Sequence, residues 1–394
     1  MVSKRSTGRR SRLGRALGAI ALVSVAAATG ALLAGCLAAP AYEGPMTRHF
    51  NGKRFRNRVE VPEKGFSDML RWWWEREPSK WQDRRGGPAG PPPARRVDEP
   101  GRLLVTHINH STMLLQLEGV NVLTDPVYSE RIGPISWVGP RRHRDPGVRF
   151  EDLPPIDVVL ISHNHYDHLD LPTLKRLARR DRPRILVPLG NSALLEKHDI
   201  PGGEDLDWGQ KRRVGPLQVT FLPSRHWSGR GMGDRFKTLW GAFVIEGRAG
   251  PIYVAGDTGW GPHLAEARRR FGPMRLALLP IGAYEPRWFM RAAHLSPAEA
   301  VEAHLVLGAR TSVPMHYGTF KLSDEGQDTP PVALRLALRG RDIARSRFPV
   351  LEHGRPLEVA PLPARQQAER PAPSSDTDCA RRPGAAGACI VSPR

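Results

Sequence analysis

The most informative hydrophobic pattern in the chain is a short apolar run at residues 158–161 (Val-Val-Leu-Ile). Because the run is short and rich in β-branched residues, it predicts a fully buried strand. Residues 113–117 and 120–124 are two more apolar runs, and the Glu118-Gly119 step between them predicts a turn that pairs two strands. The run at residues 158–161 matters most, because histidine and aspartate residues follow it closely.

Two helices are predicted from their start signals. Asp170 is an N-cap candidate with Pro172 in the first turn, and Arg179 and Arg180 place positive charge near the predicted end. Residues 296–299 (Ser-Pro-Ala-Glu) form a capping box with proline at the first helical position, which predicts a helix to about residue 307. Strands and helices therefore alternate along the chain, a pattern that predicts an α/β fold.

Four potential metal ligands follow the strand predicted at residues 158–161. In an extended chain, side chains two residues apart project to the same side, so His163 and His165 can hold one metal ion. Asp167 and His168 come next, where the chain turns, and can reach a second ion. Imidazole and carboxylate together suit zinc and related divalent ions. A solvated histidine-rich loop does not usually follow a buried strand, so we interpret the segment as a metal site.

The pattern His-x-His-x-Asp-His resembles the signature of the metallo-β-lactamase-fold hydrolases. The resemblance implies an αββα sandwich with three further ligands at later strand ends, and His226, Asp257 and His316 stand there, after apolar runs at residues 219–222, 252–255 and 313–315. It implies two divalent ions, with zinc the expected metal and iron or manganese also tolerated. One ion would take His163, His165 and His226, the other Asp167, His168 and His316, and Asp257 would bridge them.

Residues from about 103 to 353 look like a narrower branch of that fold, the N-acylphosphatidylethanolamine-hydrolysing phospholipases D. The longest similar run is residues 280–290 (Pro-Ile-Gly-Ala-Tyr-Glu-Pro-Arg-Trp-Phe-Met), which contains no predicted ligand and is followed by His294. The resemblance implies a phosphodiesterase in which a hydroxide shared by the metal ions attacks phosphorus. A phospholipid of the membrane is the implied substrate.

The same resemblance assigns the remaining site residues. Asp167 and His294 are the expected catalytic residues, and His294 would hydrogen-bond a phosphoryl oxygen or protonate the leaving group; the alternative is a structural histidine. Tyr284, Arg287 and His294 are the expected substrate contacts. Arg287 and Glu285 are interpreted as mutual partners in the site wall, or as an ion pair with no role in the chemistry. His110 is expected near the site, in a structural role.

Other functions remain open. A lactonase or a nuclease could use the same ligands, although nucleases of this superfamily usually carry an added nucleic-acid domain and no inserted domain is visible, so no nucleic acid is expected as a partner. A non-catalytic envelope lipoprotein could keep a metal ion for stability, but the complete ligand set argues against it. No cysteine stands at a ligand position, which disfavours antibiotic hydrolysis.

The N-terminus has the pattern of an export signal. Basic residues between Lys4 and Arg15 precede an apolar run at residues 16–34, so residues 1–35 are predicted to be a secretory signal. Residues 33–36 (Leu-Ala-Gly-Cys) resemble the bacterial lipobox, which implies cleavage before Cys36 and lipidation of its thiol. Leu37 favours the outer membrane, facing the periplasm, in a Gram-negative host. A transmembrane anchor is the alternative, because the run approaches the ~20 residues that a span needs.

Charge and cysteine content add little more. The net charge of +19 fits attraction to anionic lipid or another phosphate-bearing partner. It also fits codon bias, because the chain is rich in Ala, Gly and Pro. Cys379 and Cys389 could pair in an exported protein or stay idle. They lie in a Pro/Ala/Ser-rich segment that predicts disorder.

We expect the chain to divide into four parts: a signal (residues 1–35), a tether with some structure (36–100), the hydrolase domain that the resemblance implies (101–362) and a disordered tail (363–394). The tether contains a predicted helix at residues 66–75 with three consecutive tryptophans, Trp72, Trp73 and Trp74. They would lie at a membrane interface or pack on the hydrolase domain. Because consecutive residues cannot all face one way on a helix, at least one is expected to pack.

Overall fold

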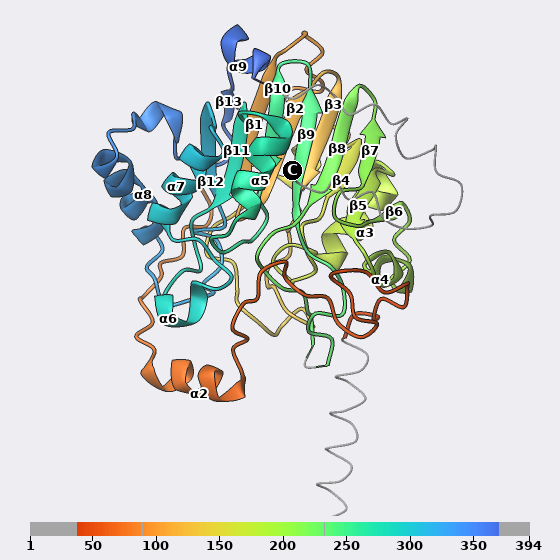
Figure 1. The fold of residues 1–394 in the computed structure, drawn as a ribbon, viewed down its shortest axis with the longest axis vertical. Helices are drawn as coiled ribbons and strands as arrows, with labels where there is room; N and C mark the ends of the chain where they lie inside the picture. The colour runs from red at the N-terminus through yellow and green to blue at the C-terminus, as the bar shows by residue number, and fades with distance from the viewer. Residues whose placement is uncertain (1–37, 88–89, 232, 370–394) are drawn as a thin grey trace, which may run out of the picture.

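The computed structural model describes residues 38–87, 90–231 and 233–369 (Figure 1). The predicted signal, Cys36, Cys379 and Cys389 lie outside the described residues. Two mixed β-sheets pack face to face with helices on their outer sides (Figure 1), which confirms the predicted αββα sandwich. No helix among the described residues is long and apolar enough to span a membrane.

The first sheet has seven strands in the order β13-β1-β2-β3-β4-β5-β6. Their bounds are β1 Leu103–Asn109, β2 Thr112–Leu117, β3 Val120–Thr124, β4 Val158–Leu160, β5 Arg184–Pro188, β6 Gly203–Leu206 and β13 Pro356–Glu358. The predicted hairpin is confirmed, because β2 and β3 pair antiparallel. Its turn residues Glu118 and Gly119 both have positive φ, 49° and 76°, which matches the twist of a tight hairpin.

The second sheet has six strands in the order β12-β11-β10-β9-β8-β7. Their bounds are β7 Lys211–Val214, β8 Leu217–Leu222, β9 Ala242–Gly247, β10 Gly250–Val254, β11 Leu276–Pro280 and β12 Thr311–Met315. Strands β10, β11 and β12 are parallel to one another, as are β3 to β6 in the first sheet. The carboxyl ends of neighbouring parallel strands meet at one edge, where ligand sites of α/β proteins are usually built.

Helices cover both outer faces. The helices are α2 Phe66–Glu75, α3 Leu171–Arg180, α4 Ser192–Lys197, α5 His263–Phe271, α6 Arg287–Met290, α7 Pro297–Val306, α8 Thr329–Gly340 and α9 Ala364–Ala368. Leu174 and Leu177 of α3 and Leu195 of α4 share a buried cluster with the outer face of the first sheet. The larger cluster fills the space between the sheets and continues under α5, α7 and α8.

The helix signals in the sequence are confirmed. Asp170 is the N-cap residue of α3, and Arg179 and Arg180 lie in its last turn. The Asp170 carboxylate bonds Ser129 and Thr173 rather than the end of the helix backbone, so it joins α3 to the loop after β3. The capping box of α7 is complete, because Ser296 accepts from the N–H of Glu299 and Glu299 accepts from the N–H of Ser296.

The segment predicted as a tether is well ordered against the hydrolase domain. Phe50 and Phe55 are buried in the larger core cluster. Their rings lie 4.6 Å apart and form one aromatic group with Tyr42. At the other end of the chain, the first residues of the predicted disordered tail form the short helix α9.

The predicted helix at residues 66–75 is present as α2. Trp72 stacks on Phe289 of α6, with ring centroids 5.0 Å apart, and its indole Nε1 donates to Asp324. Trp73 and Trp74 are 67% and 83% exposed. The expectation that at least one tryptophan packs on the domain is confirmed.

Candidate metal centre

The predicted ligands meet at the edge of the sandwich where β4, β8, β10 and β12 end. His163, His165, Asp167 and His168 follow β4, His226 follows β8, Asp257 follows β10 and His316 follows β12. The two sheet ends approach each other closely at Gly256, where an added Cβ would lie 2.4 Å from the Cβ of Ser162. Gly256 also has a φ of +59°, so both its backbone angle and its surroundings favour glycine.

Three imidazoles converge in the first group. Nε2 of His163 and Nε2 of His226 lie 2.8 Å and 3.3 Å from Nδ1 of His165. The Nδ1–H of His226 donates to the carbonyl of Ala293, and the Nδ1–H of His163 donates to Oγ of Ser162, which itself donates to Asp125. These outer bonds leave the lone pairs of both Nε2 atoms directed at the same point. A cation is the natural partner for nitrogen lone pairs that face one another.

The second group combines imidazole with carboxylate. Oδ2 of Asp167 lies 3.4 Å from Nε2 of His168 and 3.2 Å from Nε2 of His316. The Nδ1–H of His168 donates to Asp125 over 2.8 Å, so its Nε2 also keeps a free lone pair. His316 has a φ of +61°, a conformation that most side chains avoid, and its N–H donates to the carbonyl of His110.

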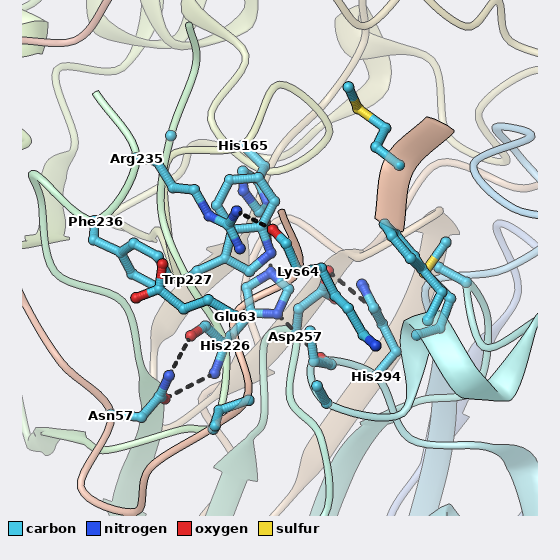
Figure 2. A pocket seen from close by; sticks show the side chains of 18 of the residues that line it. Asn57, Glu63, Lys64, His165, His226, Trp227, Arg235, Phe236, Asp257 and His294 are labelled. Atoms are coloured by element: carbon cyan, nitrogen blue, oxygen red, sulfur yellow. Dashed lines mark hydrogen bonds and ion pairs between the residues drawn. The ribbon is translucent and has the colours of Figure 1, made fainter. Parts of the chain in front are cut away.

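Asp257 lies between the two groups. Its Oδ2 is 3.0 Å from Nε2 of His316, 3.3 Å from Nε2 of His168 and 3.7 Å from Nε2 of His226. Figure 2 shows His165, His226 and His294 near Asp257 among the side chains that line a pocket. One carboxylate oxygen therefore faces ligand atoms of both groups, which is the position expected for a bridging ligand.

The electrostatics of these residues fit bound cations. Burial lowers the pKa of His165 and of His226 to about 3, so both are neutral and able to bind a metal ion. Burial also acts to lower the pKa of His316, but the carboxylates of Asp257 and Asp167 outweigh it and raise that pKa to about 9. The two buried carboxylates, Asp257 and Asp167, therefore favour a positive charge between them and His316. Oδ1 of Asp257 and Nε2 of His168 are buried without a hydrogen-bond partner among the described residues, so the donor set is open for metal ions.

The groups of buried ligand atoms include two residues outside the predicted ligand set. His110 joins Asp167, His168 and His316, and its Nε2 lies 3.0 Å from Oδ2 of Asp167. It therefore holds the carboxylate in place, consistent with the structural role expected for it. His294 is grouped with His226 and Asp257, and its Nδ1 lies 3.8 Å from Oδ2 of Asp257.

His294 is carried by the loop between α6 and α7, and Arg287 holds that loop. The guanidinium of Arg287 donates to the backbone carbonyl of His294 over 3.1 Å and to Glu299 over 2.7 Å. The prediction of a side-chain pair between Arg287 and Glu285 is wrong: Glu285 accepts from the backbone N–H of Arg287, because the guanidinium reaches toward the capping residue Glu299 of α7. Tyr284 is buried, and burial raises its pKa to about 12. Neither Tyr284 nor Arg287 lines the pocket.

Two residues that support the ligands from outside the ligand groups, Asp125 and Asn57, were not predicted. Asp125 directly follows β3, the parallel neighbour of β4, and accepts from His168 Nδ1 and from both the N–H and Oγ of Ser162. Asn57 comes from the segment predicted as a tether, and its amide bonds both the N–H and the C=O of His226. A carboxylate placed directly after the apolar run at residues 120–124 was the available signal for Asp125, whereas no local pattern marked Asn57.

Replacing Asp125 with asparagine is expected to lower metal affinity by about 10–100-fold, because the carboxylate that orients His168 and raises its basicity is lost. Titration of the purified variant with a competing chelator measures this. Asp205→Asn is the matched control, since Asp205 accepts from the N–H groups of Gly190 and Ser192 and bonds none of the predicted ligands. Equal metal affinities in the two variants would remove Asp125 from the support of the centre.

Comparisons with known proteins agree with this geometry. A family described as a β-lactamase superfamily domain matches residues 120–317, half of the chain. An uncharacterised protein of Mycobacterium tuberculosis is 43% identical over 227 residues, which are 56% of this chain and 60% of that protein. The N-acyl-phosphatidylethanolamine-hydrolyzing phospholipase D 1 of Caenorhabditis elegans is 38% identical over 232 residues, which are 56% of this chain and 65% of that protein. The match thus covers less than two thirds of either relative.

The fold is also that of solved metallohydrolases. The structure of Igni18, a metallo hydrolase from Ignicoccus hospitalis, aligns with a TM-score of 0.51 at 21% identity over 65% of this chain and 98% of that chain. The family match covers every predicted metal ligand, from His163 to His316. Fold, family match and the buried histidine and aspartate groups lead to one conclusion: the chain belongs to the metallo-β-lactamase superfamily and is a metal-dependent hydrolase of that fold.

Proposed function

We propose that the chain is a phosphodiesterase of the phospholipase D type that hydrolyses N-acylphosphatidylethanolamine-type phospholipids. One observation carries the proposal: the pocket over the metal centre is lined by an apolar wall and by an excess of cationic over acidic side chains outside the predicted ligands. The similarity to the Caenorhabditis elegans enzyme supports the same substrate class. A diacyl phosphodiester has both chemical parts, long apolar chains and a negatively charged phosphate.

The pocket is large enough for such a substrate. Its volume is about 1430 Å³, above the roughly 300–1,000 Å³ common for small-molecule sites. One wall is apolar, formed by Phe66, Met69, Trp72, Phe289, Met290 and Leu322. The lining also contains five cations, Arg54, Arg56, Lys64, Arg230 and Arg235, against two acids outside the predicted ligands, Glu60 and Glu63, of which Glu63 pairs with Arg54. Figure 2 shows Arg235, Trp227 and Phe236 along one side of the pocket, next to the histidines.

Different residues of the chain would bind the metal ions and the substrate. His163, His165 and His226 would hold one divalent ion, Asp167, His168 and His316 a second, and Asp257 would contact both. Zinc is the expected metal. When bound, a pair of such ions supplies an activated water at neutral pH and polarises a phosphoryl oxygen. Lys64 and Arg235 lie where they can attract the anionic phosphate into the pocket.

His294 is the pocket histidine that is not assigned to either metal ion, so it is available to contact the substrate. Its Nδ1 is buried without a hydrogen-bond partner among the described residues, and the side chain lines the pocket beside Asp257. A substrate oxygen placed next to Asp257 would therefore find one imidazole atom ready to form a hydrogen bond. That oxygen is either a phosphoryl oxygen or the leaving-group oxygen, and proton transfer to the latter is a task that suits histidine.

The experiment that tests the function is turnover of a substrate panel by the purified full-length chain, with and without a chelator. The panel contains N-acylphosphatidylethanolamine, an acyl lactone and a nucleic acid. We expect release of N-acylethanolamine and phosphatidic acid, loss of turnover with the chelator, and oxygen-18 from labelled water in the phosphate. Label in the ethanolamine hydroxyl would contradict attack at phosphorus. Inactivity on the phospholipid with brisk lactone hydrolysis would establish the alternative, a lactonase on the same scaffold.

For localisation, we propose an exported lipoprotein anchored through Cys36, in the outer membrane if the host is Gram-negative. The basis is the Leu-Ala-Gly-Cys sequence at residues 33–36 behind a basic and apolar leader. Replacing Cys36 with serine is expected to abolish incorporation of labelled palmitate, because the acceptor thiol is gone. Cys379→Ser is the matched control and should label normally. Unchanged labelling and membrane attachment in Cys36→Ser would contradict the lipoprotein assignment.

A further inference from the structure

The hydrophobic stripe of α2 faces away from the protein. Phe66, Met69, Leu70, Trp73 and Trp74 follow the spacing i, i+3, i+4, i+7 and i+8, which places them on one face of a helix. Such a face normally packs on a core. Here the five side chains are 48–83% exposed, and α2 has no buried residue.

The other side of α2 attaches the helix to the domain. Trp72 stacks on Phe289 and donates to Asp324, and Arg76 forms an ion pair with the same carboxylate. In Figure 1, α2 lies at the lower end of the molecule, clear of both sheets, next to the short helix α6. These contacts hold the apolar stripe in a fixed direction, outward.

A second exposed apolar segment borders the same pocket. Ile132 and Pro140 line the pocket and enclose a loop whose ends are joined by a hydrogen bond from the N–H of Ile132 to the carbonyl of Pro140. Within this loop, Ile135, Trp137 and Val138 are 39%, 73% and 36% exposed. We name the stripe of α2 and these three loop residues together the apolar rim. Phe66 and Met69 belong both to the rim and to the pocket wall, so the rim continues into the pocket.

Positive charge accompanies the apolar rim at the pocket. Lys53 and Arg56 are exposed and have no carboxylate partner among the described residues, and Arg56 lines the pocket. Arg71, on α2 itself, lies over Trp288 and pairs with Glu75. Arg56 lines the same pocket as Phe66 and Met69 of the rim. Exposed apolar and aromatic side chains together with an unpaired cation are typical of surfaces that lie at the interface of an anionic bilayer.

The described chain also begins at this pocket. Ala38 is in contact range of Gly231, a pocket residue, and the N–H of Ala39 donates to Asp234. The segment that precedes Ala38 is the predicted leader with its lipidation site at Cys36.

We propose that the apolar rim docks on a lipid bilayer containing anionic headgroups, so that the pocket opens directly onto the membrane surface. Trp73, Trp74 and Trp137 enter the interfacial layer, Arg56 meets the headgroups, and Phe66 and Met69 connect the bilayer to the apolar wall of the pocket. A lipid substrate then passes from bilayer to pocket along a continuous apolar surface. This inference rests on the proposed function for the choice of lipid as the substrate, and its vesicle test uses the anchor proposed at Cys36.

The orientation is tested with the full-length chain in vesicles of phosphatidylethanolamine and phosphatidylglycerol. In a Cys379→Ser, Cys389→Ser background, an environment-sensitive fluorophore is attached at Trp74→Cys on the rim or at Leu336→Cys. Leu336 is a matched control because it is 59% exposed on α8 and lies outside the rim. We expect a blue shift, and quenching by brominated acyl chains, at position 74 but not at 336. The anchor holds both proteins at the membrane, so equal quenching would overturn the inference.

A second measurement separates docking from chemistry. Trp73→Ser/Trp74→Ser should lower kcat/KM on vesicle substrate by about tenfold or more, because two large apolar side chains no longer enter the bilayer. Turnover of a soluble short-chain phosphodiester should be unchanged, and Val332→Ser/Leu336→Ser on α8 should match the parent on both substrates. An equal loss on both substrates would contradict docking. If no phosphodiester is turned over, the quenching result still decides the orientation. If the fluorophore at position 74 becomes shielded from solvent as protein concentration rises, without lipid, the rim would instead bind a second copy of the chain.

Discussion

Replacing Asp257 with asparagine is expected to abolish turnover, with a loss on the order of 10³-fold or more, and to lower the metal content of the purified protein. Oδ2 of Asp257 lies within 3.0–3.7 Å of Nε2 atoms from His316, His168 and His226. The carboxylate is buried, and its pKa is held well below the usual range: burial opposes this, but the neighbouring His316 and His168 outweigh it. Asparagine has nearly the same shape but removes the negative charge that faces both ligand groups.

Two measurements decide this prediction: metal per chain by mass spectrometry, and kcat on whichever substrate of the panel is turned over. Asp234→Asn is a control of equal burial, since Asp234 is 3% exposed and accepts from backbone N–H groups of Ala39 and Arg230. Full metal content in Asp257→Asn would contradict the bridging position. Equal metal loss in both variants would indicate general destabilisation instead.

The sequence predicts well those parts of the fold that depend on residues close together in the chain. The hairpin turn at Glu118-Gly119, the N-cap at Asp170 and the capping box at Ser296 each depend on residues within a few positions of one another. Strand ends are also predicted from a local pattern. An apolar run followed by a histidine or aspartate indicates both the end of a strand and a residue of the site. Figure 1 and the sheet order agree with the resulting sandwich.

The parts that sequence does not predict depend on pairing between distant segments. Asn57 bonds the backbone of His226, 169 positions away, and no local pattern connects the two. The guanidinium of Arg287 pairs with Glu299, twelve positions later in the chain, and not with the nearby Glu285. The turn between α6 and α7 brings the capping residue Glu299 within reach. The direction of the α2 stripe is a third case: its spacing predicts an amphipathic helix, but only the contacts of Trp72 show that the stripe faces outward.

His294→Ala is expected to separate catalysis from metal binding. Nδ1 of His294 is 3.8 Å from Oδ2 of Asp257 and has no hydrogen-bond partner among the described residues, and the side chain lines the pocket. If its partner is a substrate oxygen, loss of the imidazole should reduce kcat by about 10²–10⁴-fold, the range typical of a lost acid–base group. The metal content should equal that of the parent, because each predicted ion keeps its full ligand set.

The conservative variant His294→Gln distinguishes the two tasks open to this side chain. Glutamine keeps a hydrogen-bond donor but cannot transfer a proton at neutral pH, so partial recovery of kcat indicates contact with a phosphoryl oxygen, and no recovery indicates proton transfer to the leaving group. His198→Ala is the control, because His198 is only partly buried and lies after α4, outside the pocket. Loss of metal from His294→Ala would place this histidine among the ligands, with His226 and Asp257, and would require another residue to meet the substrate oxygen.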